Sequence, residues 1–142
     1  MDQNTVEFVR RGYAGASLDF TVDVRDAETF AACVRAIGDH GDFRAEQVVH
    51  LLGGDVFGDY MGYAVGRDHS PLIVVGVPFW THQARSGAHD LRGHRRLLPQ
   101  ERAGLVDRVR RAGAALGADR VTVFTSELEG VNVPHRVRLW WS

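Results

Sequence analysis

The stretch "DYMGYAVGRDHSPLIVVGVPF", residues 59–79, decides the predicted fold because it holds two strand-like segments around a turn-rich centre. The sequence "GRDHSP" favours a hairpin connection between the two segments. The second segment, from Leu72 to Phe79, is apolar at successive positions, which is typical of a central strand covered on both faces. We therefore predict an antiparallel hairpin in the middle of a sheet.

The residues before this hairpin change from a strand pattern to a helix pattern. "SLDFTVDV", residues 17–24, is apolar at every second position, which predicts a half-buried strand. "DAETFAACVRAIG", residues 26–38, has helical spacing, with Asp26 as the predicted N-cap and Gly38 as the predicted end. Residues 43–52, "FRAEQVVHLL", fit a short helix and a strand equally well.

The residues after the hairpin predict one helix and two strands. The helix begins at Pro99, which suits a first helical position, and ends at Gly117. Its predicted buried stripe consists of Val106, Val109, Gly113 and Leu116. Residues 120–126 and 135–141 then read as strands, joined by a predicted loop, "ELEGVNVP".

This order of elements predicts one α+β domain over residues 1–142. The expected architecture is a mostly antiparallel sheet with two helices on one face, ferredoxin-like or a close variant. One sheet face would then lack helices, and we expect a second copy, a ligand or residues 80–98 to cover it. Trp140 and Trp141 lie beside the carboxyl end, where unpacked tryptophans are costly. We therefore predict a homodimer that forms through the uncovered face or the C-terminal strand.

Composition excludes several kinds of chemistry. All seventeen basic residues are arginine, so a lysine Schiff base and a P-loop lysine are both excluded. The sequence also lacks the signature motifs of serine hydrolases, thiol oxidoreductases and zinc proteases. The net charge of −1 argues against a general nucleic-acid binder, but residues 80–111 carry a local charge of +5.

The single cysteine and the amino-terminal sequence indicate the compartment. Cys33 has no partner for an intramolecular disulfide, and its place on an apolar stripe predicts a core thiol in a reducing environment. No segment has the length of a membrane span or the pattern of a secretion signal. We therefore expect a cytoplasmic protein.

The most chemically suggestive stretch is "FWTHQARSGAHDLRGHRRLLP", residues 79–99. It shows no periodicity and is longer than most loops of compact domains, which favours a functional role. His82, His89 and His94 are the predicted catalytic acids or bases because imidazole titrates near neutral pH, and Asp90 is predicted to orient one of them. The same four side chains are possible metal ligands, but their spacing and the nearby arginines argue against a metal.

The predicted ligand-binding residues surround these histidines. Guanidinium groups bind carboxylates and phosphates bidentately, and an indole ring supplies an apolar wall. The glycines of residues 58–66 predict a shallow surface for close approach of a ligand or another backbone. The full predicted binding set is Trp80, Arg85, Arg92, Arg95, Arg96, Gly58 and Gly62.

These features predict a small enzyme or binding protein for an anionic small molecule. If it is an enzyme, the expected chemistry is acid–base catalysis of an isomerase, lyase or cyclase type, with no cofactor and no lysine or cysteine nucleophile. Two alternatives remain open: a non-catalytic protein-interaction module of the inhibitor, immunity or adaptor type, and an RNA-binding or RNA-cleaving domain.

Overall fold

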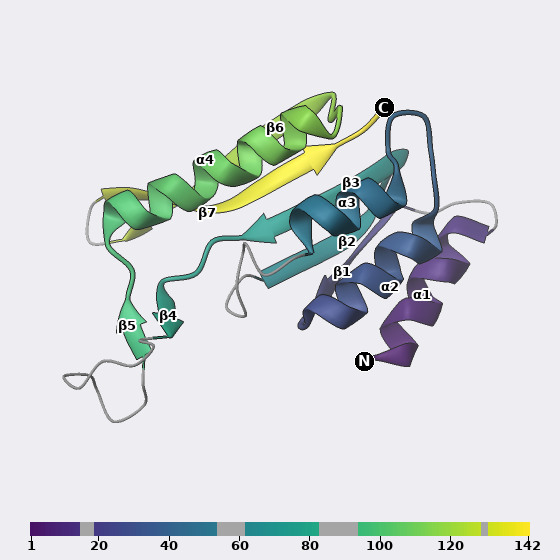
Figure 1. The fold of residues 1–142 in the computed structure, drawn as a ribbon, viewed down its shortest axis with the longest axis horizontal. Coiled ribbons are helices and arrows are strands. Elements are labelled where there is room, and N and C mark those ends of the chain that lie inside the picture. Colours follow the sequence, from purple (N-terminus) through teal and green to yellow (C-terminus); the bar gives the residue numbers. More distant parts are fainter. Residues whose placement is uncertain (15–18, 54–61, 83–93, 129–130) are drawn as a thin grey trace.

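A computed structural model describes residues 1–14, 19–53, 62–82, 94–128 and 131–142. Their helices and strands form a helical layer against a five-stranded sheet (Figure 1). The elements in chain order are α1 (Gln3–Ala14), β1 (Phe20–Val24), α2 (Ala27–Ile37), α3 (Ala45–Leu52), β2 (Gly62–Asp68), β3 (Ser70–Gly76), β4 (Trp80–His82), β5 (His94–Arg96), α4 (Pro99–Ala115), β6 (Arg120–Leu128) and β7 (Val131–Trp140). This is the predicted α+β class with an antiparallel sheet.

The main sheet has the strand order β1-β2-β3-β7-β6, and every neighbouring pair is antiparallel. The predicted central hairpin is β2 and β3, which meet at the single residue His69. The strands β4 and β5 form a separate two-stranded hairpin beyond the end of β3. The C-terminal strand β7 lies inside the sheet, where β3 and β6 already pair with its two edges. This strand therefore offers no free edge for pairing with a second copy of the chain.

The connections explain the strand directions. Two helices, α2 and α3, lie between β1 and β2. A single connecting helix would return the chain to form a parallel strand, whereas the second helix reverses the chain direction again, so β2 pairs antiparallel to β1. In contrast, β3 and β6 both run antiparallel to β7, so they are parallel to each other, and α4 connects them across it. This second half is a split β-α-β unit. The strand order as a whole does not confirm the ferredoxin-like arrangement.

Aspartate side chains cap the first turns of α2 and α3, and the sequence predicted one of these two caps. Asp26 caps α2 as predicted, because its carboxylate accepts hydrogen bonds from the Thr29 backbone N–H at 2.7 Å and the Thr29 hydroxyl at 2.8 Å. Residues 45–52, which the sequence left open, form a helix. Its first N–H, of Ala45, donates to the Asp39 carboxylate at 2.9 Å, a capping residue six positions upstream.

The structure differs from the sequence prediction in three regions. The sequence did not predict helix α1. Only two residues of this helix, Val6 and Val9, are buried, so its apolar stripe is narrow. Residues 127–128 and 131–134 of the predicted loop "ELEGVNVP" instead belong to β6 and β7, which pair with a register shift after Phe124. Residues 80–82 and 94–96 are strands, so the segment 80–98 is not wholly without regular structure.

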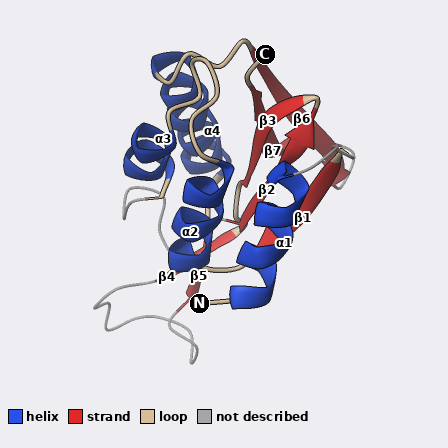
Figure 2. Ribbon diagram, turned by 90° about the vertical axis from the view of Figure 1, so that its right-hand side faces the viewer, coloured by secondary structure: helices blue, strands red, loops and turns tan. Residues whose placement is uncertain are grey.

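The core lies between the sheet and the helices, which cover one sheet face (Figure 2). Trp141 is fully buried there; its ring packs edge-on against Phe43 at 4.9 Å, and its indole N–H donates to the Leu116 carbonyl at 3.0 Å. This tryptophan is therefore satisfied within one chain and requires no dimer interface. The predicted stripe of α4 is buried, including Val109 and Gly113. None of the helices described is long and apolar enough to cross a membrane.

Alanine substitution of two glycines of β2 should affect stability differently. A Cβ at Gly66 would lie 2.0 Å from the Phe20 carbonyl oxygen, whereas a Cβ at Gly62 would meet nothing within 4 Å. We predict that Gly66→Ala lowers the free energy of unfolding by about 2 kcal/mol or more, while Gly62→Ala changes it by less than about 0.5 kcal/mol. Urea unfolding of both variants tests this, and equal stabilities would contradict the close approach of β1 and β2.

The α2 cap predicts a pH-dependent stability. The hydrogen bonds from Thr29 hold the pKa of Asp26 below its ordinary value of 3.8. The lowered pKa contributes stability above pH 3.8, and that contribution is lost as the pH falls through the folded-state pKa. We predict that Asp26→Ala costs about 1 kcal/mol at neutral pH and that the difference from wild type shrinks in acid. Asp26→Asn, which keeps a capping oxygen but does not titrate, is the control; a pH-independent cost of Asp26→Ala would refute this account.

Candidate functional site

The structure describes only part of the predicted loop site. Trp80, His82, His94, Arg95 and Arg96 lie on the β4–β5 hairpin. Its backbone register places His82 opposite His94 and Trp80 opposite Arg96. The other predicted loop residues, together with one of the two predicted glycines, lie outside the described residues: Arg85, His89, Asp90, Arg92 and Gly58. The predicted catalytic set is therefore untested.

The sheet face opposite the helices carries a second group of candidates. Successive strand residues point to opposite faces, so the register of the sheet defines this open face in three rows. None of the helices described packs against it. The three rows, each written from β1 across to β6, are Arg25, Gly62, Gly76, Arg136 and Phe124; then Asp23, Ala64, Val74, Arg138 and Thr122; then Thr21, Gly66, Leu72, Trp140 and Arg120.

The first row contains a hollow, which we call the glycine hollow. Gly62 and Gly76 are paired directly across β2 and β3, so the floor has no side chains at this point. The volume of the hollow is about 480 Å³, within the range of small-molecule sites. Its lining residues are Thr21, Asp23, Val24, Arg25, Gly62, Tyr63, Ala64, Val74, Gly76 and Arg136. The predicted binding residue Gly62 is therefore part of a real concavity.

Two arginines stand on opposite sides of this floor. Arg136 is paired with Gly76 in the register of β3 and β7. Val24, the last residue of β1, is paired with Tyr63, and continuing that register by one residue places Arg25 opposite Gly62. Both arginines are exposed, and neither forms an ion pair with any described residue. The hollow thus has a guanidinium group at each side, and Asp23 is its single acidic lining residue.

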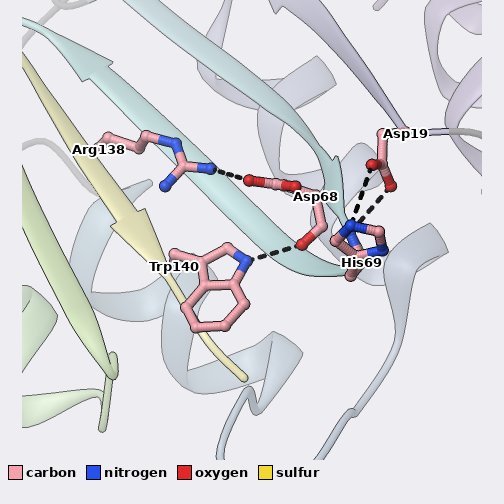
Figure 3. Close-up of polar contacts among 5 residues, drawn as sticks. All are labelled: Asp19, Asp68, His69, Arg138 and Trp140. Carbon is pink, nitrogen blue, oxygen red and sulfur yellow. Dashed lines mark hydrogen bonds and ion pairs between the residues drawn. The ribbon is translucent and has the colours of Figure 1, made fainter.

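The neighbouring arginines of the open face are engaged elsewhere. The Arg138 guanidinium donates to the Asp68 carboxylate at 2.6 Å, and the Trp140 indole N–H donates to the Asp68 carbonyl at 2.9 Å (Figure 3). Arg120 lies over the Trp140 ring, 5.2 Å from its centroid. These contacts fix the third row of the face and hold Arg138 toward the β2–β3 turn. Arg136 is left as the cation of β7 that faces the hollow.

The same turn gathers three groups that are able to ligate a metal ion. Ligand atoms of Asp19, Asp68 and His69 lie within 4.8 Å of one another, the single such cluster among the described residues. The His69 backbone N–H donates to Asp19 at 2.9 Å (Figure 3). However, the Asp68 carboxylate already binds the Arg138 guanidinium, whose positive charge opposes a divalent cation. We therefore interpret the cluster as a set of polar contacts that stabilise the tight β2–β3 turn.

The side chains of the remaining nucleophilic and titratable candidates do not point into the hollow, although the backbone of Tyr63 borders it. Cys33 is fully buried, and burial raises the pKa of its thiol to about 11, so it is the predicted core residue rather than a nucleophile. Burial also raises the pKa of Tyr63 to about 12, and its hydroxyl donates to the Leu52 carbonyl on the helix side. His135, at the register shift of β7, has a buried Nδ1 atom with no hydrogen-bond partner among the described groups.

Of the residues that line the hollow, the sequence predicted Gly62 as a binding residue and neither Arg25 nor Arg136. The alternating pattern "HRVRLWW" places Arg136 and Arg138 on one face, and Gly62 was predicted to lie on a small-residue surface. Arg25 carried no such signal, because it follows a short strand in the acidic part of the sequence. Only the strand order brings it beside β2 and within reach of the same floor.

Compared with known proteins, the chain matches no family model, no curated protein and no solved structure at a significant level. The chemistry of the site is therefore the basis for a functional proposal.

The two arginines of β7 should differ in their effect on stability. Arg138 is part-buried and ion-paired with Asp68, whereas Arg136 has no ion pair with a described residue. We predict that Arg138→Ala lowers the free energy of unfolding by about 1 kcal/mol and that Arg136→Ala changes it by less than about 0.5 kcal/mol. Denaturant unfolding at low and high salt measures both. An equal loss for Arg136→Ala would show that this residue has a structural role.

Proposed function

We propose that the protein binds a small anionic molecule in the glycine hollow, with Arg25 and Arg136 contacting its anionic groups. The observation that carries this proposal is the pair of arginines without described ion-pair partners on either side of a floor without side chains. Guanidinium groups form paired, charge-assisted hydrogen bonds to carboxylates and phosphates. A concave, partly apolar surface with a few placed polar groups is the usual form of a small-molecule site.

Ligand binding explains the two glycines of the floor better than close packing of the sheet does. Gly62 has no atom within 4 Å of a virtual Cβ, and the nearest atom to a Cβ at Gly76 is the Gly62 carbonyl oxygen at 3.5 Å. Neither position has the positive φ that favours glycine. The Cβ of an alanine would therefore fit sterically at both positions. What the two glycines provide is open space, through which a ligand can approach the backbone.

A catalytic role extends this proposal to the hairpin. Trp80, the first residue of β4, follows Gly76 by four positions, so the hairpin begins at the end of the sheet where the glycine pair lies. The register that places His82 opposite His94 supports the proposal that these residues supply acid–base chemistry to a bound anion. Binding in the hollow does not depend on this step, and a pure binding protein needs the arginines alone.

The open face also favours one alternative, a short single-stranded RNA. Phe124 is 43% exposed in the middle of β6 and is paired with Arg136, which gives an aromatic and a cation side by side. Base stacking on such a surface is a common mode of RNA recognition. Binding to RNA would fall steeply with salt concentration, whereas binding of one small anion would fall modestly.

A binding screen on three proteins tests the proposal. We predict that at least one small carboxylate or phosphate raises the unfolding temperature of the wild type by about 5 °C or more at about a hundred times its Kd. Arg136→Gln, which removes a charge, and Gly62→Val, which fills the hollow, should both abolish the shift. Gly62→Val is expected to keep or raise stability, because valine favours strands, so loss of binding would not reflect unfolding.

Arg110→Gln is the matched control, since Arg110 is an exposed arginine of α4 on the opposite layer. The proposal is wrong if no small anion shifts the transition, or if the shift survives both hollow variants. A shift from RNA alone would favour the alternative. Sedimentation of the same samples also tests the predicted homodimer, because a dimer formed through the open face would close the hollow and weaken on ligand binding.

A further inference from the structure

We infer that the ligand of the glycine hollow carries two anionic groups, one at each end of an uncharged middle, as in an α,ω-dicarboxylate. This inference rests on the proposed function and specifies its ligand. It follows from the distance between the two arginines, from what lies between them, and from the charges beside each of them.

Arg25 directly follows β1, whereas Arg136 lies on β7, and these two strands are far apart in the sheet. Two strands, β2 and β3, separate β1 from β7. With neighbouring strands about 4.8 Å apart, the backbones of Arg25 and Arg136 are separated by about 14 Å. Strand side chains stand roughly perpendicular to their sheet, so each guanidinium group stays near its own side of the hollow. A small ion with one charged group therefore contacts one arginine and leaves the other unpaired, whereas an elongated dianion contacts both.

The surface between the arginines suits an uncharged chain. The first row offers Gly62 and Gly76, and the row beside it offers Ala64 and Val74, all of which line the hollow. None of these four residues has a polar side chain. A methylene chain lying over them would bury apolar surface while its two ends pair with the guanidinium groups.

The two ends of the hollow differ in charge. Asp23 stands two residues from Arg25 on the same face of β1, so its carboxylate weakens the attraction for an anion at that end. No acidic residue of the hollow lies beside Arg136, whose charged neighbour Arg138 is neutralised by Asp68. The Arg136 end is therefore the stronger anion site, and the Arg25 end determines whether a second anionic group is recognised.

Calorimetric titration with propionate, succinate, glutarate, adipate and pimelate at constant ionic strength tests the inference. We predict that one dicarboxylate binds the wild type at least about tenfold more tightly than propionate, as one extra charge-assisted contact provides. Arg25→Gln should reduce that advantage to about twofold or less, because it removes the guanidinium group that contacts the second carboxylate. Arg136→Gln should abolish the binding of both ligands, Asp23→Asn should tighten the binding of the dicarboxylate, and Arg110→Gln should change neither affinity.

The outcomes separate this inference from the proposed function. If propionate binds as tightly as every dicarboxylate, and Arg136→Gln abolishes that binding, the anion site stands and the two-ended ligand is wrong. The two-ended ligand is also wrong if Arg25→Gln leaves the dicarboxylate advantage intact. If no anion in either experiment binds the wild type, the proposed function itself fails. Circular dichroism of each variant confirms that a lost affinity does not arise from unfolding.

Discussion

The alternation of side chains along β7 is the constraint on which the rest of the structure depends. Val137, Leu139 and Trp141 point into the core, while the residues between them point to the open face. Because β7 pairs with β3 on one side and β6 on the other, this alternation sets the register of both halves of the sheet. A slip of one residue would bring arginines into the core and expose Leu139 to water. The buried tryptophan makes that slip especially costly.

The same alternation links stability to the candidate site. The core residues of β7 are held by α4, which packs closely enough that a Cβ at Gly113 would lie 2.6 Å from the Leu139 side chain. With the helix face fixed in this way, Arg136 and Arg138 are presented on the open face at a defined spacing. Asp68 then pairs with Arg138 and not with Arg136. The register thus places Arg136 opposite Gly76, and the ion pair at the turn engages Arg138 with Asp68.

Local patterns predicted much of the fold because they report interactions between near neighbours. The Asp26 cap, the Gly38 stop at φ 77° and the buried stripe of α4 all depend on residues within one or two helical turns. The sequence left elements undecided or unpredicted where contacts outside the element decide. The helix at 45–52, which the sequence left open, begins with a hydrogen bond to Asp39, which lies outside the helix. Helix α1, which the sequence did not predict, packs against α2, and its Tyr13 donates to the Gly66 carbonyl. Neither contact leaves a periodic signal in the sequence.

By itself, the sequence determined the α+β class, the absence of lysine chemistry, the buried state of Cys33 and the small-residue surface around Gly62. Each of these follows from composition or from spacing along one element. Only the tertiary structure decided that Trp141 is satisfied within one chain and that β7 is internal to the sheet. It also decided that Arg25 and Arg136, 111 positions apart in the sequence, face each other across two glycines. The physical reason is that strand order and register, which bring them together, depend on how two faces are buried and not on local preference.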